Sequence, residues 1–243
     1  MEISEKKVRS FEAFHEIIAN LSGGYEWIFR GHSDATWQLI SRAGRSPYVR
    51  NNERALFNAW KRRAAEYVNG VGLTDWDWMA LAQHHGFPTR LLDWTSNPLV
   101  AAYFALRDPH FENDAVVFAL RTDRTFTSNS DTNPINTKGL GRVRPNAINA
   151  RISRQHSIFT IHAPVYEKLE EQMQSDDSII KIIIERDVAP RVLSILDRYG
   201  VNDSTVFPDL EGLSRYLSWV ASEADSRDEA AEKILTILGA KKS

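Results

Sequence analysis

The chain of 243 residues contains no cysteine. This absence excludes disulfide bonds, zinc sites built on thiolates and cysteine nucleophiles, so any catalysis must rest on Arg, His, Asp, Glu, Gln or hydroxyl groups. No apolar run approaches the roughly 20 residues that a membrane-spanning helix needs, and we expect no membrane partner. The first ten residues are polar and charged, without the apolar core of a signal peptide. Together these absences predict a globular cytoplasmic protein.

Several catalytic signatures are absent as well. The chain contains no H-E-x-x-H, no phosphate-binding P-loop, no G-x-G-x-x-G and no G-x-S-x-G motif. The adjacent His84 and His85 would point about 100° apart on a helix, and such a pair rarely shares an ion. We therefore expect no metal site, and arginines, carboxylates and single histidines are the remaining candidates for chemistry.

Charge is unevenly distributed along the chain, although the formal net charge is only −2. Residues 30–154 carry fifteen arginines and two lysines, whereas residues 167–232 carry seven basic against sixteen acidic residues. Arginine offers a planar fork that binds phosphate or carboxylate at two points, while lysine offers a point charge. The bias predicts a phosphate-bearing partner such as a nucleotide, RNA or DNA. A solvated surface paired with the acidic C-terminal third is the alternative.

Hydrophobic periodicity predicts a mixture of helices and strands. Helices are expected at residues 8–20, 53–69, 75–84, 97–106, 165–174, 189–199, 213–221 and 228–238, and strands at residues 25–30, 90–94, 115–120, 157–162 and 179–184. Residues 121–149 are polar and predict a long loop, either functional or mobile. We predict a single α+β domain over residues 1–243, with a mixed or antiparallel sheet, peripheral helices and a helical, acidic C-terminal part from about residue 186.

Two segments concentrate candidate functional side chains at the ends of predicted elements. In the first, FRGH at residues 29–32, a strand ends in Arg30 and Gly31, and the glycine would let a ligand approach the backbone. The second, residues 81–105, crowds eight candidates between two helices: His84, Thr89, Arg90, Asp93, Trp94, Thr95, Ser96 and Asn97. The free N–H groups at the start of the later helix favour an anion. A purely structural role is the alternative, with Asn97 as a helix cap and Asp93 paired with Arg90.

Longer stretches of the same two segments, FRGHSDATWQLISRAGR and LAQHHGFPTRLLDWTSNPLVAAYFA, resemble the FRG-domain family, which is named for its Phe-Arg-Gly triplet. The later pieces RISRQHSIFTIHAP and VFPDLEGL are similar to the family's C-terminal signatures. The resemblance spans residues 11–217. It implies one FRG domain of a family that occurs widely in bacteria and phages, and with it a toxin or phage-defence setting.

A second resemblance bears on mechanism. FRG at residues 29–31, and WTS at residues 94–96 followed by VAAYFA, are similar to the first two elements of the Arg-Ser-Glu branch of ADP-ribosyltransferases. The resemblance implies a nucleotide-binding cleft for NAD, in which Arg30 holds the pyrophosphate or ribose and Ser96 orders the nicotinamide side. We expect the rest of the NAD pocket to come from Gly31, His32, Thr89, Arg90, Trp94, Thr95 and Asn97.

The third element of that branch, a catalytic glutamate, has no direct counterpart. Gln155 stands just before the strand predicted at residues 157–162, and a glutamine carries no charge to oppose a developing cation. Three alternatives follow. Gln155 could hold the position while Asp93 or Glu185 supplies the carboxylate; Glu185 or Glu211 could be the glutamate itself; or the protein could bind a nucleotide without transferring anything.

The leading prediction is an ADP-ribosyltransferase-like toxin or phage-defence effector that uses NAD to modify nucleic acid or protein, with an antitoxin or another protein as a further partner. Its candidate catalytic residues are Arg30, His84, Asp93, Ser96, Gln155 and Glu185. One alternative is a non-catalytic module that binds a nucleotide or nucleic acid. Another is a ribonuclease built on His32, His84 and His156.

Overall fold

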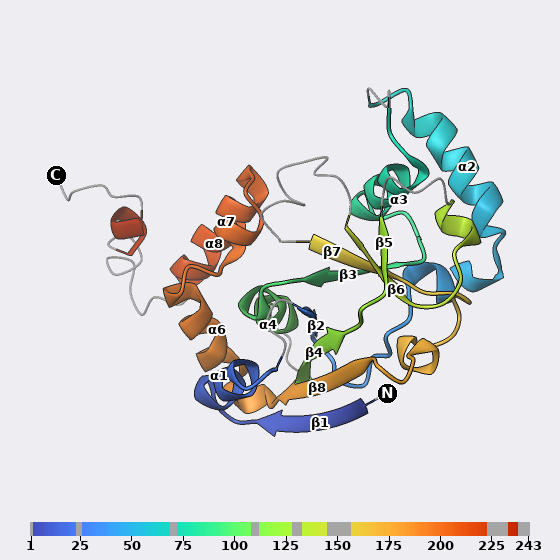
Figure 1. Ribbon diagram of the computed structural model, residues 1–243. Coiled ribbons are helices and arrows are strands. Elements are labelled where there is room, and N and C mark those ends of the chain that lie inside the picture. Colours follow the sequence, from blue (N-terminus) through green and yellow to red (C-terminus); the bar gives the residue numbers. More distant parts are fainter. Residues whose placement is uncertain are drawn as a thin grey trace.

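A computed structural model of the chain describes residues 2–22, 26–68, 72–107, 112–127, 133–144, 157–222 and 233–237. The fold is built on a mixed sheet of eight strands (Figure 1). The strands are β1 (Glu2–Val8), β2 (Trp27–His32), β3 (Leu91–Thr95), β4 (Ala115–Arg121), β5 (Thr125–Thr127), β6 (Gly141–Arg144), β7 (Ser157–Ile161) and β8 (Ser178–Ile184). The predicted α+β class is confirmed.

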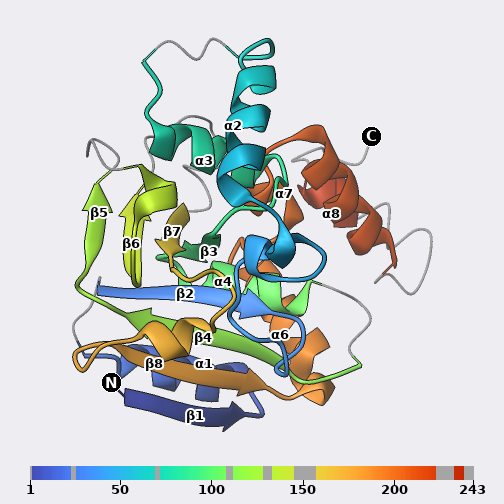
Figure 2. The ribbon, with the colours of Figure 1, turned by 90° about the vertical axis from the view of Figure 1, so that its right-hand side faces the viewer.

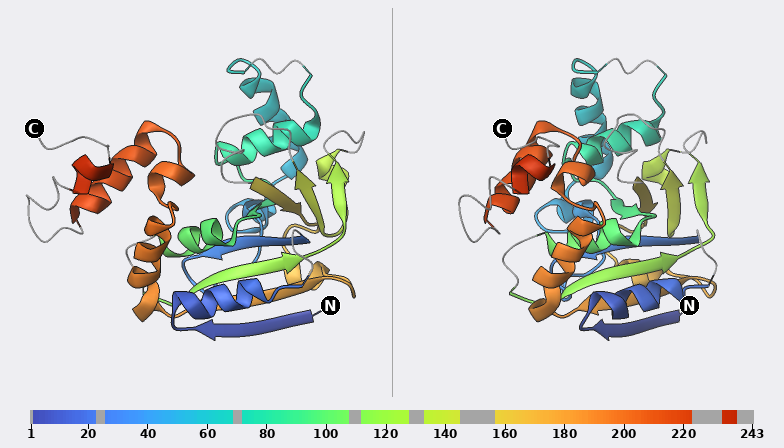
Figure 3. Two further views of the ribbon diagram at one scale, coloured as in Figure 1. Left: turned by 60° about the vertical axis from the view of Figure 1, so that its left-hand side comes forward. Right: turned by 90° about the vertical axis from the view of Figure 1, so that its left-hand side faces the viewer.

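The sheet is covered by helices of uneven length. They are α1 (Phe11–Ala19), α2 (Glu53–Ala64), α3 (Asp75–His84), α4 (Pro98–Leu106), α6 (Ala189–Arg198), α7 (Asp203–Val206) and α8 (Leu210–Ser222). Helix α4 lies in the middle, with α6, α7 and α8 on one side of it and α3 with α2 on the other (Figures 1 and 3). Helices α3 and α4 follow one another in the sequence, but they pack on different parts of the sheet.

The strand order is β1-β8-β4-β2-β3-β7-β6-β5. Neighbours are antiparallel except for the parallel pairs β1–β8 and β5–β6. Strands β2 and β4 pair along six residues, whereas β2 and β3 are paired at one position, Phe29 with Thr95. Beyond this junction the sheet turns, so that β5, β6 and β7 run steeply across the direction of β2, β4 and β8 (Figure 2). The sheet thus consists of two halves that meet at a single residue pair.

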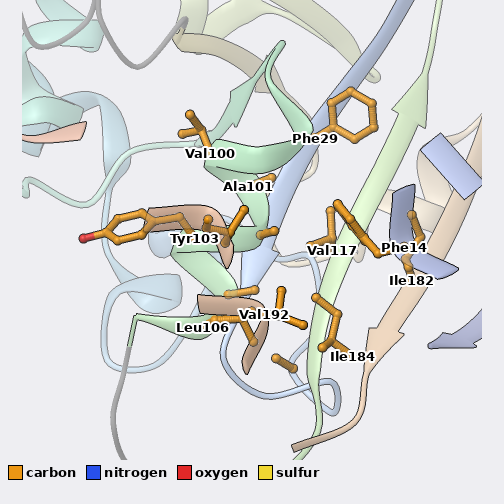
Figure 4. Close-up of a cluster of buried hydrophobic side chains, with 14 of the residues drawn as sticks. Phe14, Phe29, Val100, Ala101, Tyr103, Leu106, Val117, Ile182, Ile184 and Val192 are labelled. Atoms are coloured by element: carbon orange, nitrogen blue, oxygen red, sulfur yellow. The ribbon is translucent and has the colours of Figure 1, made fainter. Parts of the chain in front are cut away.

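A large apolar core fills the space between helices α1, α4 and α6 and the half of the sheet that consists of β1, β8, β4 and β2 (Figure 4). Successive residues of a strand point to opposite faces, so Phe29 of β2 projects into this core while Arg30 projects away from it. Val117 and Ile182 contribute the same face of β4 and β8. The alternation therefore directs the arginine of the Phe-Arg-Gly triplet toward the other side of the sheet.

Gly31 lies directly beneath α4. A Cβ atom on this residue would overlap the carbonyl oxygen of Ala101 and would lie 2.6 Å from the backbone nitrogen of Ala105. The space that a side chain would need is therefore occupied by the helix backbone. Gly31 therefore has a packing role against α4. The sequence-based expectation that this glycine also lets a ligand approach the backbone stays a prediction.

We expect Gly31→Ala to lower the free energy of unfolding by about 1–3 kcal/mol, the usual cost of an extra methyl group in a packed interior. Chemical denaturation of the purified protein measures this loss. The matched control is Ser96→Ala, a change at an exposed position in the same domain, which should leave the midpoint almost unchanged. Equal midpoints for Gly31→Ala and Ser96→Ala would contradict the close packing of β2 against α4.

Most predicted elements are present, and three predictions are wrong in instructive ways. Strand β1 was not expected, because its sequence EISEKKV is largely exposed and its pairing partner β8 lies far along the chain. The helix expected at residues 165–174 is reduced to a short 3-10 turn at Leu169–Gln172, whose first N–H donates to the distant carbonyl of Leu39. The long loop contains β5 and β6 in its described residues. Of the last predicted helix, residues 233–237 are described and are helical.

Candidate functional site

A cavity of about 350 Å³ opens between α3 and α4, beside the single pair that joins β2 to β3. It is lined by Phe29, Arg30, Gly31, Gln83, His84, Asp93, Trp94, Thr95, Ala101 and Phe104. Six of these are residues that the sequence pointed to: Arg30, Gly31, His84, Asp93, Trp94 and Thr95. The two polar segments, residues 29–32 and 81–105, are separated by 48 residues in the sequence and therefore meet only in the folded chain.

Arg30 reaches across the junction of the two half-sheets. Its Nη1 donates to the backbone carbonyl of Asp93 at 2.6 Å and lies 3.7 Å from Oδ2 of the same residue, and its Nε donates to Nε2 of His32 at 2.9 Å. Burial lowers the pKa of Arg30 below its ordinary value, the nearby Arg45 lowers it further, and Asp93 opposes both effects. Arginine nevertheless stays charged in proteins, so the cavity contains a fixed cation.

Asp93 supplies the opposite charge. Its side chain is 56% exposed, and its Oδ2 accepts a hydrogen bond from Nε2 of Gln83 at 2.7 Å. Gln83 in turn accepts from the hydroxyl of Thr89 at 2.5 Å. Sequence reasoning missed Gln83. The one available signal was its position just before His84 in the last turn of α3, at the edge of the segment already singled out.

His32 is buried next to Arg30 and packs against aromatic side chains. Its ring meets Phe118 edge-on at 5.2 Å between centroids, and the exposed Trp37 lies at 6.1 Å. Burial, and next the positive charge of Arg30, lower the pKa of His32 to about 3. The neutral ring accepts the Arg30 N–H at Nε2, so at neutral pH His32 orients the guanidinium, and this nitrogen has no proton to give as a general acid.

The neutral state of buried histidines predicts a loss of stability in acid. Burial lowers the pKa of His32 to about 3 and that of His162 to about 4, whereas an unfolded histidine titrates near 6.5. Between these values the unfolded chain binds more protons, so the free energy of unfolding falls as pH is lowered from about 6.5, by up to about 1.4 kcal/mol per histidine per pH unit. Denaturation at a series of pH values measures the slope.

The variant His32→Gln sharpens this test, because glutamine offers Arg30 an acceptor and does not titrate. We expect a shallower dependence of stability on pH in this variant than in the parent protein. Identical slopes for the two proteins would show that His32 is already accessible to protons in the folded state.

Arg90 lies outside the cavity. Its Nε and Nη2 donate to the two carboxylate oxygens of Glu53 at 2.8 and 2.5 Å, and its Nη1 donates to the carbonyls of Pro134 and Thr137. The Arg90 side chain is 8% exposed and that of Glu53 is 17% exposed. The arginine proposed from sequence as a nucleotide ligand thus ties the start of α2 to β3 and to the segment before β6.

The remaining residues of the second motif act locally in this structure. Asn97 caps α4, with its Oδ1 accepting from the backbone N–H of Leu99 at 2.9 Å. The Trp94 ring is buried, and its indole N–H donates to Oγ1 of Thr160 at 2.8 Å. Ser96 is exposed and is not among the lining residues of the cavity. The polar residues of this segment therefore have three different roles: some cap a helix, some make hydrogen bonds in the core, and a smaller set lines the cavity.

Neither glutamate considered from the sequence lies at the cavity. Glu185 follows β8 and accepts from Arg9 at 2.9 Å, and Glu211 on α8 pairs with Arg215 at 2.5 Å. Gln155 and His156 lie outside the described residues. Among the acidic candidates that the structure describes, Asp93 is the one that lines the cavity.

Several arginines of the basic region have partners within the protein. Besides Arg90, Arg124 pairs with Asp177 at 3.1 Å, and Arg42 donates to the carbonyl of Gly86 at 2.7 Å. The guanidinium of Arg107 lies over the Phe207 ring at 4.7 Å. The arginine excess over lysine therefore reflects structural bonds in part, which narrows the set of arginines available to an external phosphate.

In the ranges that the structure describes, no helix is both long and apolar enough to cross a membrane. Across the same ranges, no cluster of three or more histidine, aspartate or glutamate side chains is arranged to hold a metal ion.

Residues 25–114 match a family model described as the FRG domain. This range runs from β2 through α4 and includes every residue that lines the cavity. No curated protein and no solved structure matches the chain.

Proposed function

Because residues 25–114 of this chain are an FRG domain, we propose that the cavity within them is a nucleotide site and that the protein transfers ADP-ribose from NAD to a nucleic acid or protein. The observation that carries the proposal is the pairing of Arg30 with Asp93 inside one cavity. A fixed cation and a carboxylate are the two charges that such a transfer needs. Arg30 belongs to the first segment that resembles an ADP-ribosyltransferase, and Asp93 stands directly before the second, WTS at residues 94–96.

Arg30 suits the phosphates of the dinucleotide. A guanidinium binds phosphate oxygens through parallel N–H donors, and the hydrogen bonds of Arg30 to His32 and to the Asp93 carbonyl fix the position of its guanidinium. A preorganised cation loses little freedom when it binds an anion, which favours affinity. Because His32 stays neutral, the charge at this position does not depend on pH in the physiological range.

Asp93 suits the reacting sugar. In the transfer, the bond between ribose C1′ and the nicotinamide nitrogen breaks, nicotinamide leaves with the electron pair, and positive charge develops on the ribose. A carboxylate beside this charge stabilises the transition state more than the ground state. The acceptor then forms a bond to C1′ and releases the proton of its nucleophilic group to solvent. Of the carboxylates weighed against Gln155, Asp93 is the one that lines the cavity.

The size and lining of the cavity agree with a ligand that enters in part. A volume of about 350 Å³ lies in the lower part of the range for small-molecule sites, which is enough for one nucleoside-sized half of NAD. Phe29 and Phe104 supply apolar surface for a ring, while Thr95 adds a hydroxyl. On the family resemblance, we place the activity in a bacterial toxin or phage-defence setting, with an antitoxin as a natural partner.

The proposal is tested by adding the purified protein and NAD to a cell lysate, which supplies the acceptors. Free nicotinamide is measured together with the transfer of ADP-ribose that carries a label on its adenine. We expect both signals, and we expect Arg30→Ala to abolish them. Failure to bind NAD or to modify any acceptor would overturn the proposal. Binding of NAD without nicotinamide release would support a nucleotide-binding module instead. Salt-sensitive association with RNA or DNA, lost after charge reversal of Arg62, Arg63, Arg142 and Arg144, would support a nucleic-acid-binding module.

A further inference from the structure

A row of hydrogen bonds runs from the protein interior to the carboxylate of Asp93. The backbone N–H of Leu91 donates to Oγ1 of Thr89 at 3.1 Å, the Thr89 hydroxyl donates to Oε1 of Gln83 at 2.5 Å, and Nε2 of Gln83 donates to Oδ2 of Asp93 at 2.7 Å. Thr89 is 2% exposed and Asp93 is largely exposed, so the row leads from core to cavity.

The direction of the bonds between the side chains of this row is fixed by its last member. An ionised carboxylate can only accept, so Gln83 presents its amide nitrogen to Asp93. The carbonyl oxygen of Gln83 then faces Thr89 and accepts its hydroxyl proton, while the Thr89 oxygen accepts from the backbone N–H of Leu91. The Gln83 side chain therefore has one orientation in which both of its polar ends are satisfied.

The row also connects three consecutive pieces of the fold. Gln83 lies in the last turn of α3, Thr89 in the turn that follows, and Asp93 in the middle of β3. Gly86 makes the reversal with φ +75, and its carbonyl accepts from Nη1 of Arg42 at 2.7 Å. The end of α3 is thereby held at a fixed distance from the strand that carries the carboxylate.

From this arrangement we infer that Gln83 and Thr89 are positioning residues, which hold Oδ2 of Asp93 and leave Oδ1 as the oxygen that meets the ribose of the substrate. The functional part of this inference rests on the proposed ADP-ribosyl transfer; the hydrogen-bonded row itself does not. Oδ2 receives the Gln83 N–H and lies 3.7 Å from Nη1 of Arg30, so both neighbours act on the same oxygen. The second oxygen is the one free to change partners during a reaction.

A first experiment tests the row without any activity. The side-chain amide protons of Gln83 are followed by NMR in the parent protein and in the variants Asp93→Leu, Thr89→Val and Thr89→Ser. We expect Asp93→Leu and Thr89→Val to shift these resonances and to speed their exchange with water, because each removes one partner. Thr89→Ser keeps the hydroxyl and should retain the parent spectrum. Gln83 resonances that ignore both Asp93→Leu and Thr89→Val would overturn the inference.

A second experiment tests the consequence for catalysis. Gln83→Met keeps the length of the side chain but cannot donate to Asp93, and we expect it to lower kcat for nicotinamide release by about 10- to 100-fold with little change in KM, as for a misplaced reacting group. Thr89→Ser should restore the turnover that Thr89→Val loses. Because Thr89→Val removes a buried hydroxyl, the folding of this variant is checked by circular dichroism. Gln83 is partly exposed, so Gln83→Met tests the same row without a change in the core.

The two experiments separate failure of the inference from failure of the proposed function. If the Gln83 side-chain amide responds to Asp93→Leu and Thr89→Val but the protein does not consume NAD, the hydrogen-bonded row is supported and the transferase is refuted. Turnover of NAD that is equal in the parent protein and in Gln83→Met would leave the transferase and refute the positioning role. Loss of binding, with KM raised and kcat unchanged, would also contradict a role confined to Asp93.

Discussion

Replacement of Asp93 by asparagine is expected to reduce nicotinamide release from NAD by about 10²- to 10³-fold, the usual cost of removing one preorganised electrostatic group from a reaction centre. Asparagine keeps the size of the side chain and an oxygen that accepts from Gln83, but it carries no charge to oppose the cation that develops on the ribose. The effect should therefore fall on kcat, while the KM for NAD stays close to that of the parent protein.

Glu185→Gln is the matched control, because it also neutralises a carboxylate that the sequence offered as a candidate. Glu185 pairs with Arg9 at the far end of β8 and does not line the cavity, so we expect its neutralisation to leave turnover unchanged. Full activity in Asp93→Asn together with a loss in Glu185→Gln would reverse the assignment of the catalytic carboxylate.

Replacement of Arg90 by methionine is expected to lower the free energy of unfolding by about 3–5 kcal/mol, as breaking a buried ion pair does when one partner is left uncompensated. The carboxylate of Glu53, which is 17% exposed, would lose both of its hydrogen bonds from Arg90. Urea denaturation measures the difference. Arg63→Met is the control at the exposed pair Arg63–Glu66, where we expect about 0–1 kcal/mol.

The same variant separates the two roles that Arg90 could have. In the structure the ion pair of Arg90 with Glu53 connects the start of β3 to α2. The Arg90→Met variant should therefore bind NAD normally at temperatures where it remains folded. A protein of unchanged stability that no longer binds NAD would show instead that Arg90 is a ligand of the nucleotide, as the sequence motif alone suggested.

The resemblance of FRG and WTS to ADP-ribosyltransferase elements predicted that the two segments share one cleft. The sequence placed Arg30 at the end of a strand, whereas β2 continues to His32. The pairing of Phe29 with Thr95 is what brings Arg30 close to Asp93. Local signals also placed the helices well: Asn97 followed by proline gives the start of α4, and the aspartate-rich first turn after Thr74 gives the start of α3.

The distinction between cavity-lining and purely structural residues was beyond the sequence, because it depends on contacts between residues that are far apart in the chain. Arg90 and Asp93 stand three residues apart and looked equally suited to a nucleotide. What separates them is Glu53, which α2 brings to Arg90 from 37 residues away. Gln83 was missed for the same reason, since an amide in a helix has no evident role until Thr89 and Asp93 are seen on either side of it.

The measurement that tests the central claim most directly is a titration of the labelled protein with NAD, followed by NMR of the backbone amides. A nucleotide site at the junction of β2 and β3 predicts that resonances of Gly31, Asp93 and Thr95 move with added NAD, and that those of Glu185 and of α8 do not. The movements should disappear in Arg30→Ala. Unchanged spectra at saturating NAD, or changes confined to regions away from this cavity, would contradict a nucleotide site between α3 and α4.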